Sequence, residues 1–322
     1  MGVNSLWPAL DASSRPVTAE DLDGKVLAVD LSIWLVEACT SRILKTEHKH
    51  PHLFLTLCLA SFLLRHGVLP IVVVEGARHP RKRWTSDRPD PGREALQAWS
   101  RQAARLLRAL GVPTLVAAGE AEACCARLTT AGIADGVLTE DGDALLYGAT
   151  RVIRGATVDG LQKLRARVYD ASALPWLRRE LVALGLCCGT DLDEGVPRVG
   201  PVHAAAFVSS RRGSGTDALD ALRGWRDEKT HQVDSDDRVV DLCDDDHDEI
   251  AAHCAARRWP PDDLVATYLA DESVVGATSL KWRRPSVDAL TFANAERCVH
   301  GFHARPSLRY VLGRVARLGA GE

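Results

Sequence analysis

The sequence predicts an α/β fold whose strands form a parallel sheet. Four short apolar segments have the pattern of buried strands, and helical segments separate them along the chain. Each strand ends at an acidic residue or leads into one within a few residues. Because helical crossovers place the carboxyl ends of parallel strands at one edge of a sheet, these acids should meet there although they are far apart in sequence.

The first two predicted strands share this arrangement. The strand from Lys25 to Asp30 ends in a carboxylate, and a helical pattern begins directly after it. An apolar helix from Leu53 to Arg65, closed by Gly67, precedes the second strand, which runs from Leu69 to Glu75. Asp30 and Glu75 are therefore expected at equivalent positions, each at the end of a strand.

The third and fourth strands flank the densest acidic stretch of the chain. An amphipathic helix from Glu94 to Leu110 is followed by the third strand, Thr114 to Ala117, and the fourth strand is Gly136 to Thr139. A stable fold gains nothing obvious from like charges massed between them, which indicates a positive species at this place. The five acids of this stretch are Glu120, Glu122, Glu140, Asp141 and Asp143.

The spacing of Glu120 and Glu122 sets a limit on their geometry. Residues two apart on a regular helix point to nearly opposite sides, so both cannot face one point from the same helix. One of them should lie in the turn before the helix or act through water. Glu140 is expected to face solvent.

A basic, proline-containing segment follows Glu75 and Gly76. It runs from Arg78 to Arg88 and contains Trp84, and its prolines argue against a continuous helix. Cations beside an aromatic ring suit phosphate contact and base stacking, but a solvated surface loop explains the pattern equally well.

A second candidate for nucleic-acid contact follows a predicted helix from Leu174 to Cys188. Asp191 comes directly after that helix, and a hairpin with Gly195 and Gly200 joins it to the next helical segment. Such a hairpin leaves backbone N–H groups free at a helix N-terminus, which can hold phosphate. Further helices are predicted over residues 261–271, 285–300 and 306–318.

The acids indicate a site for two divalent cations that hydrolyse a phosphodiester. Two Mg²⁺ ions roughly 4 Å apart can activate water and stabilise the departing oxygen. Mg²⁺ prefers carboxylates and water, and Mn²⁺ could substitute for it. Acids in first helical turns also favour the helix dipole, so Asp30 or Glu120 taken alone would indicate a structural role. The predicted catalytic and metal-binding residues are Asp30, Glu75, Glu120, Glu122, Asp141, Asp143 and Asp191.

Composition is consistent with a globular intracellular protein that binds a polyanion. The 322 residues are 46% hydrophobic and contain neither a long apolar run nor a secretory signal. The formal charge is −3, but residues 234–249 hold nine acids and one arginine, so the rest of the chain is mildly basic. Residues 209–249 lose hydrophobic periodicity and are expected to be partly disordered.

The cysteines do not indicate disulfides or a zinc site. The nine cysteines fit no disulfide framework, and Cys243, His247, His253 and Cys254 match no familiar zinc spacing.

Six motifs resemble the XPG/flap-endonuclease family in order and spacing. The Gly-Glu-Ala-Glu-Ala block followed by Thr-Glu-Asp-Gly-Asp is highly specific, and the Leu-Trp ending of the first motif is similar to Gen-type Holliday-junction resolvases. The likeness covers residues 1 to about 208, and a shorter piece beyond them. The motifs are Met1–Trp7, Ala28–Asp30, Val74–Gly76, Ala118–Ala123, Thr139–Asp143 and Gly189–Asp191.

The resemblance implies a PIN-like 5′ nuclease core with a helix-two-turn-helix module and C-terminal helices. The expected divisions are an N-terminal nuclease region over 1–110, an internal nuclease region with the hairpin module over 111–208, an acidic insertion over 209–250 and a helical segment over 251–322. The segment from Arg78 to Arg88 would correspond to the family's arch. The residues expected to contact DNA are Gly2, Arg81, Lys82, Arg83, Gly195, Arg198 and Gly200.

The implied activity is Mg²⁺-dependent incision of branched DNA in the nucleus, at 5′ flaps, fork-like arms and Holliday junctions, the last as a homodimer. A PCNA-binding box of the flap-endonuclease kind is absent from the C-terminus, and so is a chromodomain. The hairpin departs from the family because Arg198 replaces a glycine at a position where a positive φ costs on the order of 1 kcal/mol. The alternatives are a 5′ flap endonuclease or 5′–3′ exonuclease of the same superfamily, and a DNA-binding paralogue without catalysis.

Overall fold

The computed structural model describes residues 6–77, 79–81, 91–158, 164–212, 215–227, 245–270 and 280–283. Gly2, Lys82 and Arg83 lie outside these residues, as do the helices predicted over 285–300 and 306–318. No helix in the described ranges combines the length and the apolar character needed to cross a membrane.

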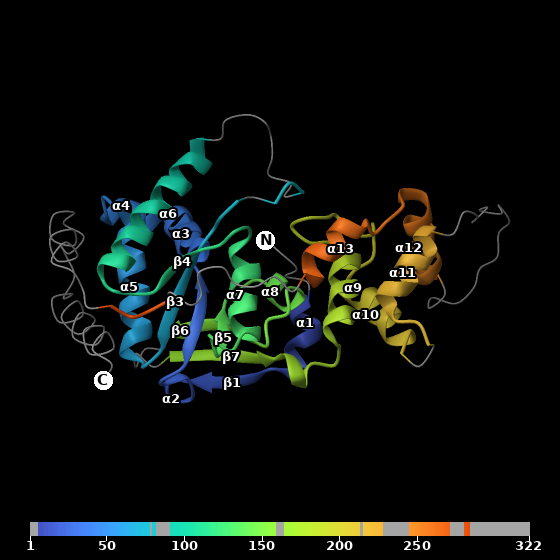
Figure 1. The fold of residues 1–322 in the computed structure, drawn as a ribbon, viewed down its shortest axis with the longest axis horizontal. Coiled ribbons are helices and arrows are strands. Elements are labelled where there is room, and N and C mark those ends of the chain that lie inside the picture. Colours follow the sequence, from blue (N-terminus) through green and yellow to red (C-terminus); the bar gives the residue numbers. More distant parts are fainter. Residues whose placement is uncertain are drawn as a thin grey trace.

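Seven strands in the described part of the chain form one sheet, in the order β1-β7-β6-β5-β2-β3-β4 (Figure 1). The five strands from β6 to β4 run parallel, and β1 and β7 are antiparallel additions at one edge. The strands are β1 (Arg15–Thr18), β2 (Val26–Asp30), β3 (Leu69–Val74), β4 (Thr114–Val116), β5 (Gly136–Leu138), β6 (Arg151–Val158) and β7 (Leu164–Asp170).

The four strands predicted from the sequence are β2, β3, β4 and β5, and their parallel pairing confirms the predicted fold class. Strands β1, β6 and β7 were not predicted from the sequence. In β7 exposed Arg165 and Arg167 alternate with buried Ala166 and Val168, which is the pattern of a strand with one solvated face. That alternation was available in the sequence, but its charged residues gave no apolar run to find.

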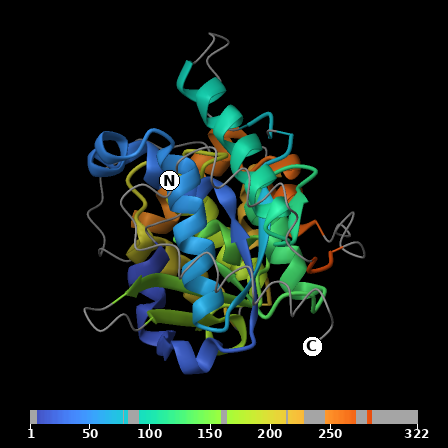
Figure 2. The same cartoon turned by 90° about the vertical axis from the view of Figure 1, so that its left-hand side faces the viewer.

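Helices cover both faces of the sheet and create two apolar cores. Leu27 and Val29 of β2 pack with α3 (Leu31–Thr40), α5 (Pro51–Arg65) and α6 (Pro91–Ala109). Ala28 points to the opposite core, which contains α7 (Ala121–Thr130), α8 (Asp143–Leu146) and α9 (Arg178–Cys188). Figure 2 shows α5 and α6 lying over the near side of the strands. The remaining helices are α1 (Trp7–Leu10), α2 (Ala19–Leu22), α4 (Arg42–Glu47), α10 (Pro201–Ser210), α11 (Ala218–Asp227), α12 (Asp245–Arg257) and α13 (Asp262–Leu269), with 3-10 turns at Asp11–Ser13 and Ala171–Ala173.

Helices α9 to α13 extend the second core beyond the edge of the sheet (Figure 1). The loss of hydrophobic periodicity predicted after residue 209 does not extend over α11, because Ala218, Leu219 and Leu222 of this helix are buried against that core. The spacing of these residues puts them on one helical face. Residues 228–244 of the predicted acidic insertion lie outside the described ranges.

Candidate active site

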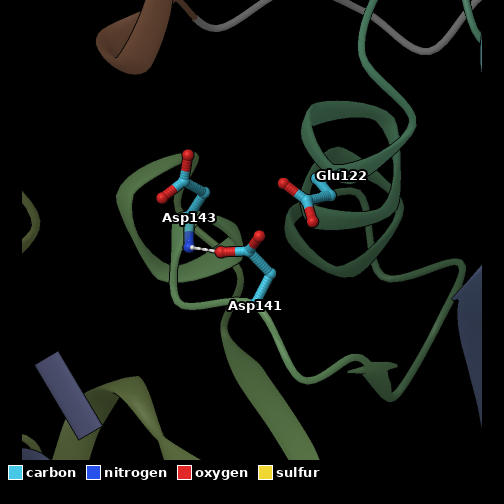
Figure 3. A group of neighbouring side chains, drawn as sticks. All are labelled: Glu122, Asp141 and Asp143. Carbon is cyan, nitrogen blue, oxygen red and sulfur yellow. Dashed lines mark hydrogen bonds between the residues drawn. The ribbon is translucent and has the colours of Figure 1, made fainter. Parts of the chain in front are cut away.

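Three carboxylates meet beyond the carboxyl ends of β4 and β5 (Figure 3). Glu122 projects from the first turn of α7, Asp141 lies in the loop after β5, and Asp143 is the first residue of α8. One oxygen from each side chain lies within 4.8 Å of the other two. Among the described residues, these three side chains form the group of His, Cys, Asp or Glu residues that could offer three ligand atoms to one ion.

Short-range hydrogen bonds fix the loop that carries Asp141 and Asp143. The Asp141 N–H donates to Thr139 Oγ1 at 3.0 Å, and the Asp143 N–H donates to Asp141 Oδ1 at 3.0 Å. Each bond spans two residues, which is the geometry of a side chain that stabilises a turn. The loop therefore holds the two aspartates close together although their like charges repel.

The spacing problem of Glu120 and Glu122 is resolved by where α7 begins. Glu120 has extended backbone angles, φ −65° and ψ 134°, and stands just before the helix, whereas Glu122 lies in its first turn. The expectation that one of the two lies in the preceding turn is confirmed. The Glu120 carboxylate also accepts a hydrogen bond from the His79 N–H at 3.2 Å.

Asp30 and Glu75 lie at the ends of β2 and β3 and also cap helices. Asp30 is 3% exposed and accepts hydrogen bonds from the Ser32 N–H at 2.8 Å and from the Ser32 hydroxyl at 2.6 Å. The Glu75 carboxylate accepts a hydrogen bond from the Ala121 N–H at 2.8 Å. Both acids thus accept hydrogen bonds from N–H groups at helix starts. The cap by Asp30 is consistent with its place directly before a predicted helix, whereas the cap by Glu75 could not be predicted because Ala121 is distant in sequence.

Several of the predicted acids raise the pKa of the same two buried groups, Tyr147 and Cys125. Burial raises the pKa of the Tyr147 hydroxyl, and the charges of Asp143, Glu122, Glu120 and Glu75 raise it further. Burial likewise raises the pKa of the Cys125 thiol, with additional contributions from Asp30, Glu122 and Glu75. Five of the predicted acids therefore act on this one region.

The seventh acid, Asp191, acts on Asp141. The pKa of Asp141 is raised from 3.8 to about 6, first by burial and then by the negative charge of Asp191, against the lowering effect of the Asp143 N–H. Burial first, and a second acid nearby, thus disfavour the charged form of this carboxyl, which a bound cation would favour. The donors are all carboxylate oxygens, which is the ligand chemistry that Mg²⁺ and Mn²⁺ prefer, so the residues fit a divalent metal.

Four of the predicted DNA-contacting residues, Arg81, Gly195, Arg198 and Gly200, lie in the described part of the chain. Arg81 forms a two-pronged ion pair with Asp263 of α13, with Nε to Oδ2 at 2.7 Å and Nη2 to Oδ1 at 2.8 Å. His79, two residues earlier, contacts Thr267 of the same helix through Nε2 at 3.2 Å. The base of the predicted arch is thus attached to α13, which the sequence did not reveal.

Three residues between α9 and α10 have positive φ: Gly189, Gly195 and Arg198. Gly195 has φ 70°, and a Cβ there would lie 2.4 Å from the Gly189 nitrogen. Arg198 has φ 65°, as expected where it replaces the family's glycine, whereas Gly200 has φ −91° and stands just before α10.

Two of the four residues that matched no familiar zinc spacing lie near Trp259 or in the core. The side chain of Cys254 is fully buried, and His253 packs edge-on against Trp259 at 5.3 Å between ring centroids.

Comparison with known families accounts for this arrangement. The XPG N-terminal domain matches residues 1–94, and the XPG I-region matches residues 111–191. The chain belongs to the XPG family of nucleases. All seven predicted acids lie within these two matched regions.

Gen proteins are among the relatives of this XPG-family chain. Mouse flap endonuclease GEN homolog 1 is 34% identical over 252 residues, which cover 72% of this chain and 27% of the mouse protein. The human homologue is 34% identical over 66% of this chain and 25% of its own length. A crystal structure of human GEN1 in complex with Holliday junction DNA matches with a TM-score of 0.78 at 27% identity, covering 97% of this chain and 78% of that one. The chain therefore spans about a quarter of the length of these two relatives.

Proposed function

We propose that this chain is a structure-selective, metal-dependent DNA endonuclease that cuts branched DNA, namely Holliday junctions, 5′ flaps and fork-like arms, in repair and recombination. The observation that carries the proposal is the meeting of Glu122, Asp141 and Asp143 at the carboxyl edge of an XPG-type sheet. The similarity to Gen proteins supports branched DNA as the substrate, and nuclear action as a homodimer on a junction is part of the same proposal.

Glu122, Asp141 and Asp143 would hold the ions, with Asp30, Glu75, Glu120 and Asp191 contributing directly or through water. Two Mg²⁺ or Mn²⁺ ions bound there would supply an activated water and stabilise negative charge on the phosphodiester. The chain contributes orientation: Asp141 and Asp143 are fixed by the turn that begins at Thr139. Tyr147 and Cys125, whose pKa values the charges of these acids raise, are both buried.

The hairpin before α10 supports duplex binding. Among the residues that the structure describes, no side chain caps the start of α10, where Gly200 precedes Pro201, and the next two side chains, Val202 and His203, are exposed. A phosphate at this helix start, as a hairpin that leads into a helix N-terminus can hold, is part of the proposal. Gly195 and Arg198, both with positive φ, shape the turn that leads into α10.

The decisive experiment compares end-labelled Holliday junction, 5′ flap and plain duplex of equal length in Mg²⁺. We expect nicks close to the branch point in the first two substrates and none in the duplex. Equal cutting of plain duplex would contradict structure selectivity. Symmetric paired nicks across the junction support a resolvase, whereas cutting confined to the flap or release from a 5′ end supports the alternative flap endonuclease or exonuclease. Binding of branched DNA without any cutting would indicate the inactive paralogue.

A further inference from the structure

Glu140, which the sequence analysis assigned to solvent, has contacts on three sides. Its backbone carbonyl accepts a hydrogen bond from Trp7 Nε1 at 3.0 Å, and its Oε1 accepts one from the Gly155 N–H at 2.7 Å. Its Oε2 lies 3.2 Å from Arg154 Nε in an ion pair. Residue 140 therefore connects the loop after β5 to both α1 and β6.

These contacts close into a ring. The Arg154 guanidinium lies over the Trp7 indole, with Cζ 4.6 Å from the ring centroid, so Trp7, Glu140 and Arg154 each contact the other two. Trp7 is 2% exposed and packs against Tyr169 at 4.7 Å between centroids. The Tyr169 hydroxyl donates to Asp11 Oδ1 at 2.6 Å, which attaches the ring to the start of the chain and to β7.

Glu140 connects this ring of contacts to the acidic site. Glu140 is covalently next to Asp141, and on its other side Thr139 is held by a backbone bond to the Ile153 carbonyl at 3.1 Å. A change in the backbone at residue 140 would move the Asp141 carboxylate, and displacements of about 1 Å in a reacting site cost on the order of 100-fold in rate. The Glu140 side chain is 56% exposed, so its ion pair adds little to global stability.

We propose that Glu140 is a positioning residue that, through its contacts with Trp7, Gly155 and Arg154, holds the metal-binding loop in its ligating geometry. This inference rests on the proposed metal site. It assigns a role to the Leu-Trp ending of the N-terminal motif, because the indole N–H and the indole face are both used. Outer contacts that orient metal ligands commonly change metal affinity by about 10- to 100-fold.

The test measures Mn²⁺ binding to the full chain without DNA, by electron paramagnetic resonance, for Glu140→Ala, Glu140→Gln and the wild type. Glutamine keeps an oxygen acceptor for the Gly155 N–H but removes the charge. We expect Glu140→Ala to weaken Mn²⁺ binding about tenfold and Glu140→Gln to stay within about twofold of wild type. Thermal unfolding of the metal-free variants should remain close to wild type, since the side chain is largely exposed.

A second variant, Trp7→Phe, keeps an aromatic ring for Arg154 but removes the N–H donor. We expect it to weaken Mn²⁺ binding several-fold as well. The proposal is overturned if Glu140→Ala binds Mn²⁺ as tightly as wild type. It is also overturned if Glu140→Gln and Glu140→Ala weaken Mn²⁺ binding equally, because the loss would then come from the removed charge acting at long range. A wild-type chain that binds no Mn²⁺ would overturn both this inference and the metal site. Mn²⁺ binding that depends on Glu140, in a chain that does not cut branched DNA, would refute the proposed function alone.

Discussion

The carboxylate of Glu75 accepts a hydrogen bond from the Ala121 N–H at 2.8 Å, across 46 residues of sequence. This contact joins the end of β3 to the start of α7, which are the two elements that carry the Glu75 and Glu120–Glu122 motifs. Glu75 is consequently both a helix cap and a candidate for the metal site.

This double role predicts that two substitutions of Glu75 will differ. Glu75→Ala should lower the free energy of unfolding by about 1 kcal/mol, because the Ala121 N–H loses its acceptor. Glu75→Gln keeps an oxygen acceptor and should retain most of this stability. Both should cut branched DNA more slowly, since neither keeps the carboxylate. Urea unfolding and single-turnover cleavage check the two parts, and a Glu75→Ala protein as stable as wild type would refute the capping role.

Asp141→Asn should stabilise the metal-free protein at neutral pH. The folded pKa of about 6 lies above the ordinary 3.8, so the fold prefers the protonated carboxyl, and stability is lost as pH rises through this interval. Removing the ionised group should raise the free energy of unfolding by up to about 3 kcal/mol at pH 7, and by progressively less as the pH falls toward 4. Thermal unfolding of both proteins in a chelator at pH 7 and pH 5 measures the difference. A melting temperature for the variant at or below that of wild type at pH 7 would contradict this explanation.

The same proton competes with a metal for Asp141. Below pH 6 the carboxyl is increasingly protonated, so Mn²⁺ affinity of the wild type should fall as pH decreases from 7 to 5. Titration at several pH values with constant ionic strength measures this dependence. An affinity unchanged over that range would show that Asp141 does not bind the ion directly.

Arg81 gives a test of the expected DNA contact at the base of the arch. Its guanidinium is held by Asp263 in the free protein, and the Arg81 hydrogen bond is the main reason that the pKa of Asp263 is lowered. If Arg81 moves to a phosphate in the complex, Asp263→Asn should tighten junction binding, and Arg81→Ala should weaken it and reduce the salt-dependence slope by about one. Both variants should unfold within about 1 kcal/mol of wild type, because the pair is partly exposed. Unchanged affinity in Arg81→Ala would leave Arg81 with a structural role only.

Arg198 predicts a stabilising substitution in the hairpin. Its φ of 65° is costly for a residue with a side chain, so Arg198→Gly should raise the free energy of unfolding by about 1 kcal/mol. Gly195→Ala is the matched control and should destabilise, since its Cβ would meet the Gly189 nitrogen at 2.4 Å. Duplex affinity measured on the same proteins shows whether the arginine charge is used for DNA. A destabilised Arg198→Gly would show that the Arg198 side chain makes contacts worth more than the strain.

The parallel strands and the acids at their ends could be predicted because both depend on short, local patterns. Buried strands such as Leu69–Val74 are continuous apolar runs, and the acid that follows each run needs no tertiary information to be found. The antiparallel pair β6–β7 was missed because its solvated face carries arginines. Glu140 is exposed, as predicted, but its contacts with Trp7 and Gly155 could not be predicted, because these residues are distant in sequence and gave no local signal.

The most direct measurement of the central claim is single-turnover cleavage of a labelled Holliday junction and a 5′ flap in Mg²⁺ by wild type and Asp143→Asn. Asp143 is 2% exposed, and its backbone N–H to Asp141 does not depend on the side chain, so the variant should keep the loop and bind both substrates normally. We expect the wild type to nick near the branch and the variant to cut on the order of 100-fold more slowly or not at all. Cleavage by Asp143→Asn at the wild-type rate would contradict the claim that the carboxylates at the strand ends form the active site.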